Sequence, residues 1–134
     1  MYQIGMTQWI VGDEPLEISC ARMEKYGYNE IEFAADPYKL DPEKCLALMQ
    51  KHHLNCHSLC GLYDDSRDLT DGNESGRNAV QYLKDSVDFA HKVGATVIIV
   101  VPSPVGRTQK PEHMTMEELR KNAVANIREA ADYA

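Results

Sequence analysis

The sequence has 134 residues, the usual length of one domain, and residues 1–134 are predicted to form a single domain with its own core. Hydrophobic residues make up 43% of the chain and charged residues 26%, which is typical of a globular protein and excludes a disordered one. The net charge of −7 argues against a general nucleic-acid binder, because such proteins need a basic face that replaces counterions.

The first half of the chain alternates between strand and helix patterns. A short strand is predicted over residues 3–9, and Asp13 is expected to cap the helix that follows it. Polar and apolar residues alternate over residues 30–34, which predicts a second strand with one polar face. Asp41 precedes a proline, and this pair predicts the start of the second helix.

The second half continues the alternation with longer loops. Residues 55–61 are predicted to form the third strand, and a long polar loop over residues 63–75 follows it. Residues 97–101 are an unbroken apolar run rich in β-branched side chains, which predicts a fourth strand covered on both faces. Thr115 and Glu118 have the spacing of a capping box and predict the start of the last helix.

Four strand–helix units in succession predict an α/β fold with parallel strands and right-handed crossovers. Such a chain forms either an open doubly wound sheet or part of a closed (β/α)8 barrel. No glycine-rich phosphate loop follows the first strand, which argues against a dinucleotide-binding sheet but leaves a flavodoxin-like module open. The chain ends at Ala134 without a helix C-cap, so we expect an unfinished αβ repeat.

Two further features concern the cellular location of the protein. No apolar run approaches the roughly 20 residues of a membrane span, and no basic leader precedes the first apolar residues, so we expect no membrane partner and no secretory signal. The four cysteines lie in segments with helix or strand patterns and lack the spacing of a zinc site. We expect them to be reduced thiols of a cytoplasmic protein.

Several segments share their order and spacing with a known family. They are IGMTQW at residues 4–9, YGYNEIEFAA at 26–35, RDL at 67–69, the helical pattern over 77–94 and IREAADYA at 127–134. Together they resemble the xylose-isomerase-like sugar phosphate isomerase/epimerase family, which includes tagatose/psicose 3-epimerases. The resemblance covers essentially the whole chain, and it implies the N-terminal half of a (β/α)8 TIM barrel.

The resemblance also implies a chemistry. In that family a divalent metal (Mn, Mg, Co or Zn) is held by Glu, Asp, His and Glu on strands five to eight, and two glutamates move a proton beside the carbonyl of a keto-sugar or sugar phosphate. None of these residues has a counterpart here. We therefore assign no catalytic residue and no metal ligand, expect no metal to be bound by this chain, and expect it to be inactive alone. Whether the chain is itself an enzyme is left open.

Five residues are candidates for substrate binding, because the chemistry of such a barrel lies at the carboxyl ends of its strands. Trp9 would form an apolar wall against a sugar ring, or simply pack. Glu32 needs a partner, which is either a sugar hydroxyl or a structural Lys or Arg. His57, placed at the end of the third strand, would donate to a substrate hydroxyl, although the strand's inward phase is ambiguous. Ser103 would present its hydroxyl, and Arg107 would bind phosphate or carboxylate unless it is a solvated loop residue.

A half-barrel leaves open strand edges and an uncovered interior face, both of which favour association. We therefore expect a homo-oligomer or a chain completed by a C-terminal half-barrel, with a small sugar or sugar phosphate as the substrate of the intact fold. Two alternatives remain open. One is a non-catalytic half-barrel fragment that folds as an oligomer, and the other is a flavodoxin-like binding module.

Overall fold

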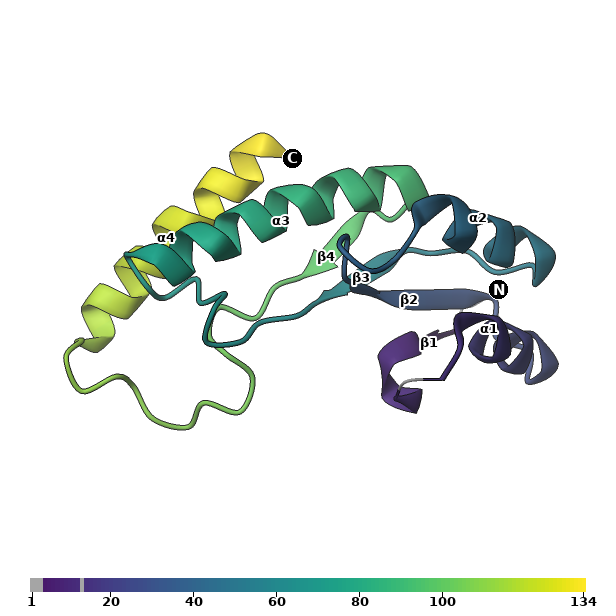
Figure 1. Ribbon diagram of the computed structural model, residues 1–134, viewed down its shortest axis with the longest axis horizontal. Coiled ribbons are helices and arrows are strands. Elements are labelled where there is room, and N and C mark those ends of the chain that lie inside the picture. The colour runs from purple at the N-terminus through teal and green to yellow at the C-terminus, as the bar shows by residue number, and fades with distance from the viewer. Residues whose placement is uncertain (1–3, 13) are drawn as a thin grey trace. The chain divides into compact units, whose positions relative to one another are not determined.

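The computed structural model describes residues 4–12 and 14–134, in which strands and helices alternate along the chain (Figure 1). In order, the elements are β1 (Gly5–Thr7), the 3-10 helix η1 (Gln8–Val11), α1 (Leu16–Lys25), β2 (Glu30–Ala35), α2 (Pro42–Lys51), β3 (Ser58–Gly61), α3 (Glu74–Val93), β4 (Val97–Ile99) and α4 (Met116–Tyr133). Among the described residues, no helix is both long enough and apolar enough to cross a membrane.

The four strands form one parallel sheet in the order β1-β2-β3-β4. This confirms the predicted α/β fold with four βα units. Each strand lies beside the strand that precedes it in the chain, and the order never reverses. In a flavodoxin-like sheet, the first strand lies inside the sheet and the order of the strands reverses at a switch point. The alternative of a flavodoxin-like module is therefore wrong. The sequential order is that of a barrel wall.

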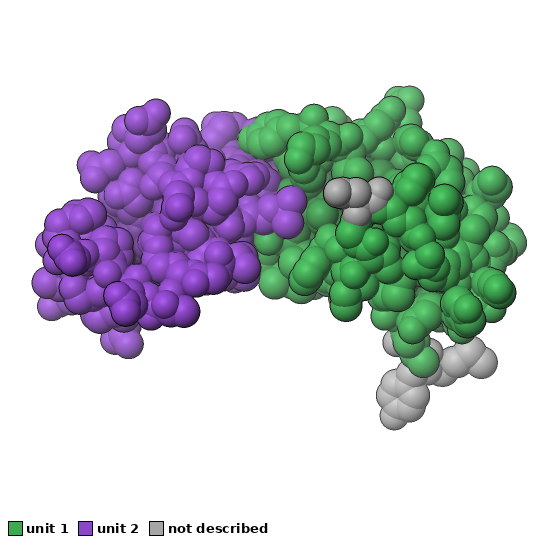
Figure 2. Space-filling view, turned by 60° about the horizontal axis from the view of Figure 1, so that its bottom comes forward, with its two compact units in different colours: residues 1–61, 88–99 green, residues 62–87, 100–134 purple. Residues whose placement is uncertain are grey.

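The residues group into two compact units, which Figure 2 shows in different colours. Unit 1 consists of Met1–Gly61 and Asp88–Ile99 and contains the whole sheet together with α1 and α2. Unit 2 consists of Leu62–Val87 and Val100–Ala134 and contains the two long loops that follow β3 and β4, as well as α4. Helix α3 contributes to both units.

The sheet of unit 1 has one buried face and one uncovered face. Ile31, Phe33 and Leu59 on the buried face are at most 1% exposed and form the core with apolar residues of the helices. On the opposite face, Val97 and Ile99 are 43% and 41% exposed. The prediction that this apolar run is covered on both faces is therefore wrong for the chain by itself, because helices cover only one side of a barrel wall.

Several predicted boundaries differ from the observed ones. The first strand is shorter than predicted, because the chain turns into the 3-10 helix at Gln8. The third strand begins at Ser58, and Asn55 makes only an isolated bridge with Glu30. The fourth strand ends at Ile99 and not at residue 101. The predicted start at Gln3 and the predicted cap Asp13 lie outside the described residues.

Two predicted helix starts are confirmed. Asp41 caps α2, and its side chain accepts a hydrogen bond from the backbone N–H of Glu43 at 2.9 Å. Thr115 and Glu118 form the reciprocal capping box that begins α4. Both caps satisfy backbone N–H groups that the first turn of a helix leaves unpaired.

Unit 2 is held together by helix side chains that bind loop backbone. On α4, the Asn126 side-chain amide donates to the carbonyls of Leu69 at 2.8 Å and Asp71 at 3.0 Å. Near the start of α3, a Cβ atom on Gly76 would lie 2.0 Å from the Asp71 carbonyl oxygen. The loop can pass this close to α3 only because residue 76 has no side chain.

Candidate functional site

Glu32 occupies the middle of the uncovered sheet face. Its strand neighbour Thr7 donates from Oγ1 to Glu32 Oε1 at 2.7 Å, and Ser58 on β3 donates from Oγ to Oε2 at 2.5 Å. Glu32 is thus bound to hydroxyl groups of both neighbouring strands. A carboxylate has about four acceptor positions, so each oxygen keeps room for another donor. The arrangement fixes the carboxylate and leaves it able to accept hydrogen bonds from a ligand.

Cys60 lies near this carboxylate, and Trp9 lies near Cys60. Trp9 belongs to η1, directly after β1, and is 50% exposed. Burial raises the pKa of the Cys60 thiol and the charge of Glu32 raises it further, while a hydrogen bond with the Trp9 side chain lowers it. The predicted residues Trp9 and Glu32 thus share Cys60 as a neighbour. An indole beside a carboxylate and hydroxyls suits a polyol, which presents C–H groups on one side and hydroxyls on the other.

Ser58 and Cys60 share the uncovered face with Glu32, since they alternate with the buried Leu59. This shows which side chains of the third strand face the uncovered side, a point that the sequence pattern left ambiguous. Sequence reasoning did not select Ser58 or Cys60 as site residues. Their alternation with Leu59 was the available signal, but it could not be assigned to a face without the register of β3 against β2.

His57 lies elsewhere. It precedes β3, so it is at the amino end of the strand, opposite to the edge where barrel chemistry occurs. Its side chain is exposed, and Nδ1 lies 3.1 Å from Oγ1 of Thr96, which precedes β4. The predicted position at the end of the third strand is therefore wrong, because β3 runs from Ser58 to Gly61 and residue 57 comes before it.

In unit 2, Arg107 is bound by two carboxylates and is not a solvated loop residue. Its Nη1 donates to Asp68, whose side chain is only 6% exposed, and its Nη2 donates to Oδ1 of Asp65 at 3.2 Å. Asp68 also accepts from the backbone N–H of Thr70 at 2.8 Å. These bonds join the loop after β3 to the loop after β4. The alternative that Arg107 is a solvated loop residue is therefore wrong.

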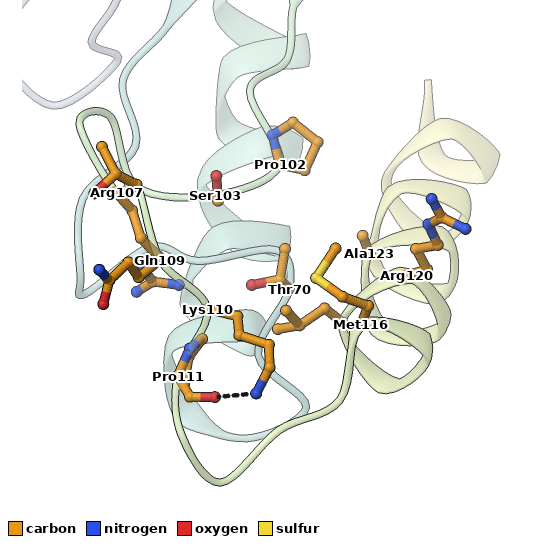
Figure 3. Close-up of a pocket in the computed structure, with 12 residues that line it drawn as sticks. Thr70, Pro102, Ser103, Arg107, Gln109, Lys110, Pro111, Met116, Arg120 and Ala123 are labelled. Atoms are coloured by element: carbon orange, nitrogen blue, oxygen red, sulfur yellow. Dashed lines mark hydrogen bonds between the residues drawn. The ribbon is translucent and has the colours of Figure 1, made fainter.

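Ser103 and Arg107 line one cavity of unit 2, with a volume of about 360 Å³ (Figure 3). Its apolar wall includes Met116 and Leu119 from the start of α4. Lys110 also lines the cavity. The structure thus gathers the predicted residues in two places, Trp9 and Glu32 on the sheet of unit 1, and Ser103 and Arg107 around this cavity.

The donor groups that the family's metal requires are not assembled within residues 4–12 and 14–134. No cluster of three or more His, Cys, Asp or Glu side chains in these ranges could hold a metal ion. The four cysteines are free thiols. Burial, followed by the neighbouring Cys20 and Cys56, raises the pKa of Cys45 to about 12, so this thiol is protonated and unreactive at neutral pH.

Comparison with known proteins relates this geometry to a family. The family model described as "Xylose isomerase-like TIM barrel" matches residues 20–134. No match was found among curated protein sequences.

Solved structures match nearly the whole chain. D-allulose 3-epimerase from Methylomonas sp., in complex with D-allulose, is 21% identical with a TM-score of 0.81, and the match covers 96% of this chain and 46% of that one. D-psicose 3-epimerase from Clostridium cellulolyticum H10, with D-tagatose, is 15% identical with a TM-score of 0.79, covering 98% and 48%. The IolI protein with a bound zinc atom is 20% identical with a TM-score of 0.74, covering 99% and 48%. The chain spans about half the length of these structures.

Proposed function

Because the chain belongs to the xylose isomerase-like TIM barrel family, we propose that it supplies sugar-positioning groups to a ketose isomerase or epimerase. The observation that carries the proposal is the Glu32 carboxylate, which Thr7 and Ser58 hold on the uncovered sheet face, with Cys60 between it and the indole of Trp9 as a neighbour of both. The matched epimerase structures contain D-allulose and D-tagatose, which supports a keto-sugar as the ligand class.

In this proposal, the chain binds and orients the sugar but does not move the proton. Glu32 accepts hydrogen bonds from sugar hydroxyls, and Trp9 covers an apolar side of the sugar. The reaction itself removes a proton beside the carbonyl and returns it to another position or face, which needs an acid/base pair near the substrate. The metal of the family polarises the carbonyl in such reactions. The described residues offer no group to hold it, so we assign no metal-dependent step to this chain.

The uncovered face supports a further part of the proposal, that additional polypeptide covers it. Among the described residues, β4 pairs only with β3, and Val97 and Ile99 are exposed beside its free edge. A free strand edge next to exposed apolar side chains favours pairing with another strand. A C-terminal half-barrel of the same family or a second copy of the chain would provide that strand. His57 is left out of the sugar site, because it lies at the opposite edge of the sheet.

Sugar binding is tested by titrating D-allulose and D-tagatose into the isotope-labelled protein and following amide shifts by NMR. We expect saturable shifts in β1, β2 and β3, and binding at least fivefold weaker in Glu32→Gln. Glu30→Gln is the matched control, because Glu30 is on the same strand and the same face two residues earlier, and should bind like the wild type. Absence of binding in the wild type, or equal binding in Glu32→Gln, would contradict the proposal.

Turnover is tested separately on the same protein with Mn²⁺ or Co²⁺ present. The chain alone is expected to leave both ketoses unchanged, because residues 4–12 and 14–134 assemble no group that could hold the metal of the reaction. Epimerisation that a chelator abolishes would contradict this part of the proposal while leaving the sugar-binding result unaffected.

A further inference from the structure

We propose that the cavity of unit 2 is a binding site for a phosphate monoester, with Arg107 as its main ligand and Asp65 as a displaceable ion-pair partner of that arginine. The site lies entirely within unit 2 and is lined by Ser103, Arg107 and Lys110 (Figure 3). The proposal does not rest on the sugar-binding role of Glu32. It follows from the difference in burial between the two carboxylates that bind Arg107, since Asp68 is buried and Asp65 is exposed.

Asp68 holds the guanidinium in position. Its side chain is 6% exposed and accepts hydrogen bonds from the backbone N–H of Thr70 at 2.8 Å and from Thr70 Oγ1 at 2.5 Å, as well as from Arg107 Nη1. A carboxylate bound by this many donors cannot leave without exposing them. Arg107 is therefore fixed through one side of its planar fork, and the rest of the fork keeps a defined direction.

Asp65 occupies the other side of the fork only loosely. Its side chain is 93% exposed, and it meets Arg107 Nη2 at 3.2 Å. Ion pairs of such exposed groups contribute little, because water and salt screen them and the side chain loses freedom. A phosphate monoester carries more charge and three acceptor oxygens, and it forms bidentate bonds with arginine. A phosphate therefore competes well for the position that Asp65 fills.

Lys110 adds a second positive charge at the cavity. Its Nζ donates to the carbonyl of Met114 at 2.7 Å and to that of Pro111 at 3.4 Å, which orients the ammonium group (Figure 3 shows the Pro111 bond). An ammonium group has three donors, so one more acceptor can bind there. The Ser103 hydroxyl lines the same space. In the proposed site, Arg107 binds the phosphate, and Lys110 and Ser103 are the further donors that line the cavity.

The remainder of the cavity suits the organic part of a small ligand. Its volume of about 360 Å³ lies at the lower end of the range for small-molecule sites, roughly 300–1,000 Å³. Met116, Leu119 and Ala123 on α4 provide an apolar wall. These features favour a short phosphorylated metabolite over a bare inorganic ion.

The site is tested by titrating inorganic phosphate and glycerol phosphate into the wild-type protein, Asp65→Asn and Arg107→Lys, with binding followed by NMR. We expect wild-type binding in the millimolar range, with glycerol phosphate tighter than inorganic phosphate. Asp65→Asn should bind both up to about fivefold more tightly, since it removes a weak competitor. Arg107→Lys should bind at least tenfold more weakly, because lysine cannot form the bidentate bond.

The controls use a neighbouring ion pair. Arg67 has the same side-chain exposure as Arg107, 23%, and is paired with Asp64. Asp64→Asn and Arg67→Lys should therefore leave phosphate binding unchanged. An acetate titration distinguishes a phosphate site from a general anion site. No binding to Asp65→Asn at tens of millimolar phosphate, equal binding in wild type and Asp65→Asn, or acetate binding as tight as phosphate would each overturn the proposal.

Discussion

Asp68 and Arg107 are 39 residues apart in the sequence, yet they form an ion pair in which the carboxylate is 6% exposed. They come from the two long loops that follow β3 and β4, and their pairing makes one connected layer of two segments that have no regular secondary structure of their own. The backbone N–H of Val105 also donates to the Tyr63 carbonyl at 3.3 Å across the same two loops. The pair is the central polar contact of this layer.

Replacing Asp68 with asparagine should destabilise the protein by about 2–3 kcal/mol. The substitution removes a charge from a buried pair and leaves Arg107 with only the exposed Asp65 as a charged partner, and losses of this kind fall in that range. Urea unfolding measures the change, and limited proteolysis should show new cleavage in both loops. Asp65→Asn is the control and should change stability by less than about 0.5 kcal/mol. Equal effects of the two substitutions would contradict the assignment of Asp68 as the anchor.

Replacing Gly76 with alanine should destabilise unit 2 by about 1–3 kcal/mol. The new Cβ would lie 2.0 Å from the Asp71 carbonyl oxygen and 3.0 Å from Asn126 Nδ2, so the loop must move away from α3. Gly72→Ala should cost less, because its nearest neighbour is the Asn122 side chain at 3.2 Å, which can shift. Thermal unfolding compares the two variants. If Gly76→Ala proved as stable as the wild type, the close approach would not be needed.

The contribution of Cys45 to stability should depend on alkaline pH. Burial raises its pKa from an ordinary value near 9.0 to about 12 in the folded protein. Below pH 9 the thiol is protonated in both states, and between pH 9 and 12 only the unfolded state loses the proton. The stability that wild type has over Cys45→Ala is therefore complete below pH 9 and decreases as the pH rises toward 12.

Urea unfolding of wild type and Cys45→Ala from pH 7 to pH 10.5 measures this effect. The difference in the free energy of unfolding should shrink by on the order of 1–2 kcal/mol across that range. Ionisation of other groups affects both proteins alike and cancels in the difference. A difference that stays constant up to pH 10.5 would show that burial does not perturb the Cys45 thiol.

Replacing Ile99 with glutamate should reduce self-association without unfolding the isolated chain. Ile99 is 41% exposed on the uncovered sheet face, so a charge there meets water in the monomer but would be buried when another strand covers the face. Light scattering after size-exclusion chromatography should show a smaller average mass than for wild type. Val105→Glu, at a 73% exposed loop position, is the control. A wild-type protein that is monomeric at all concentrations would rule out self-association.

The sequence predicted the type and order of the elements well, because local patterns determine them. The alternation around Glu32 follows the two faces of β2, and the Asp41 and Thr115 caps were recognised from residues next to them. The apolar run around Val97 and Ile99 predicted a strand covered on both faces, whereas the half-barrel expectation left the interior face uncovered, and the exposure of these two residues agrees with the second. An apolar run reflects what a strand packs against in the assembled fold. Among the described residues, only one face of this sheet is covered.

The arrangement of the candidate residues could be predicted only in part. Trp9 and Glu32 were chosen from their positions in strand patterns, and the structure places both near Cys60, while their role in binding stays a prediction. The partner of Arg107 was missed, because no local pattern relates residues that are 39 positions apart. His57 was placed at the carboxyl end of the third strand, but β3 begins only at Ser58. The residue therefore precedes the strand and lies at the edge of the sheet opposite to the one where ligands bind.

The sequential order of the sheet has a consequence for how such a chain grows, both during synthesis and in evolution. Every strand pairs with the one made just before it, so each new βα unit can add to an existing wall without breaking a pair that is already formed. The loop closed by each addition is one unit long, which keeps its entropic cost nearly constant along the chain. A wall built in this way can be lengthened by duplication or joined to another wall. Among the described residues the outer edge of β4 has no partner strand, so an added strand would pair there.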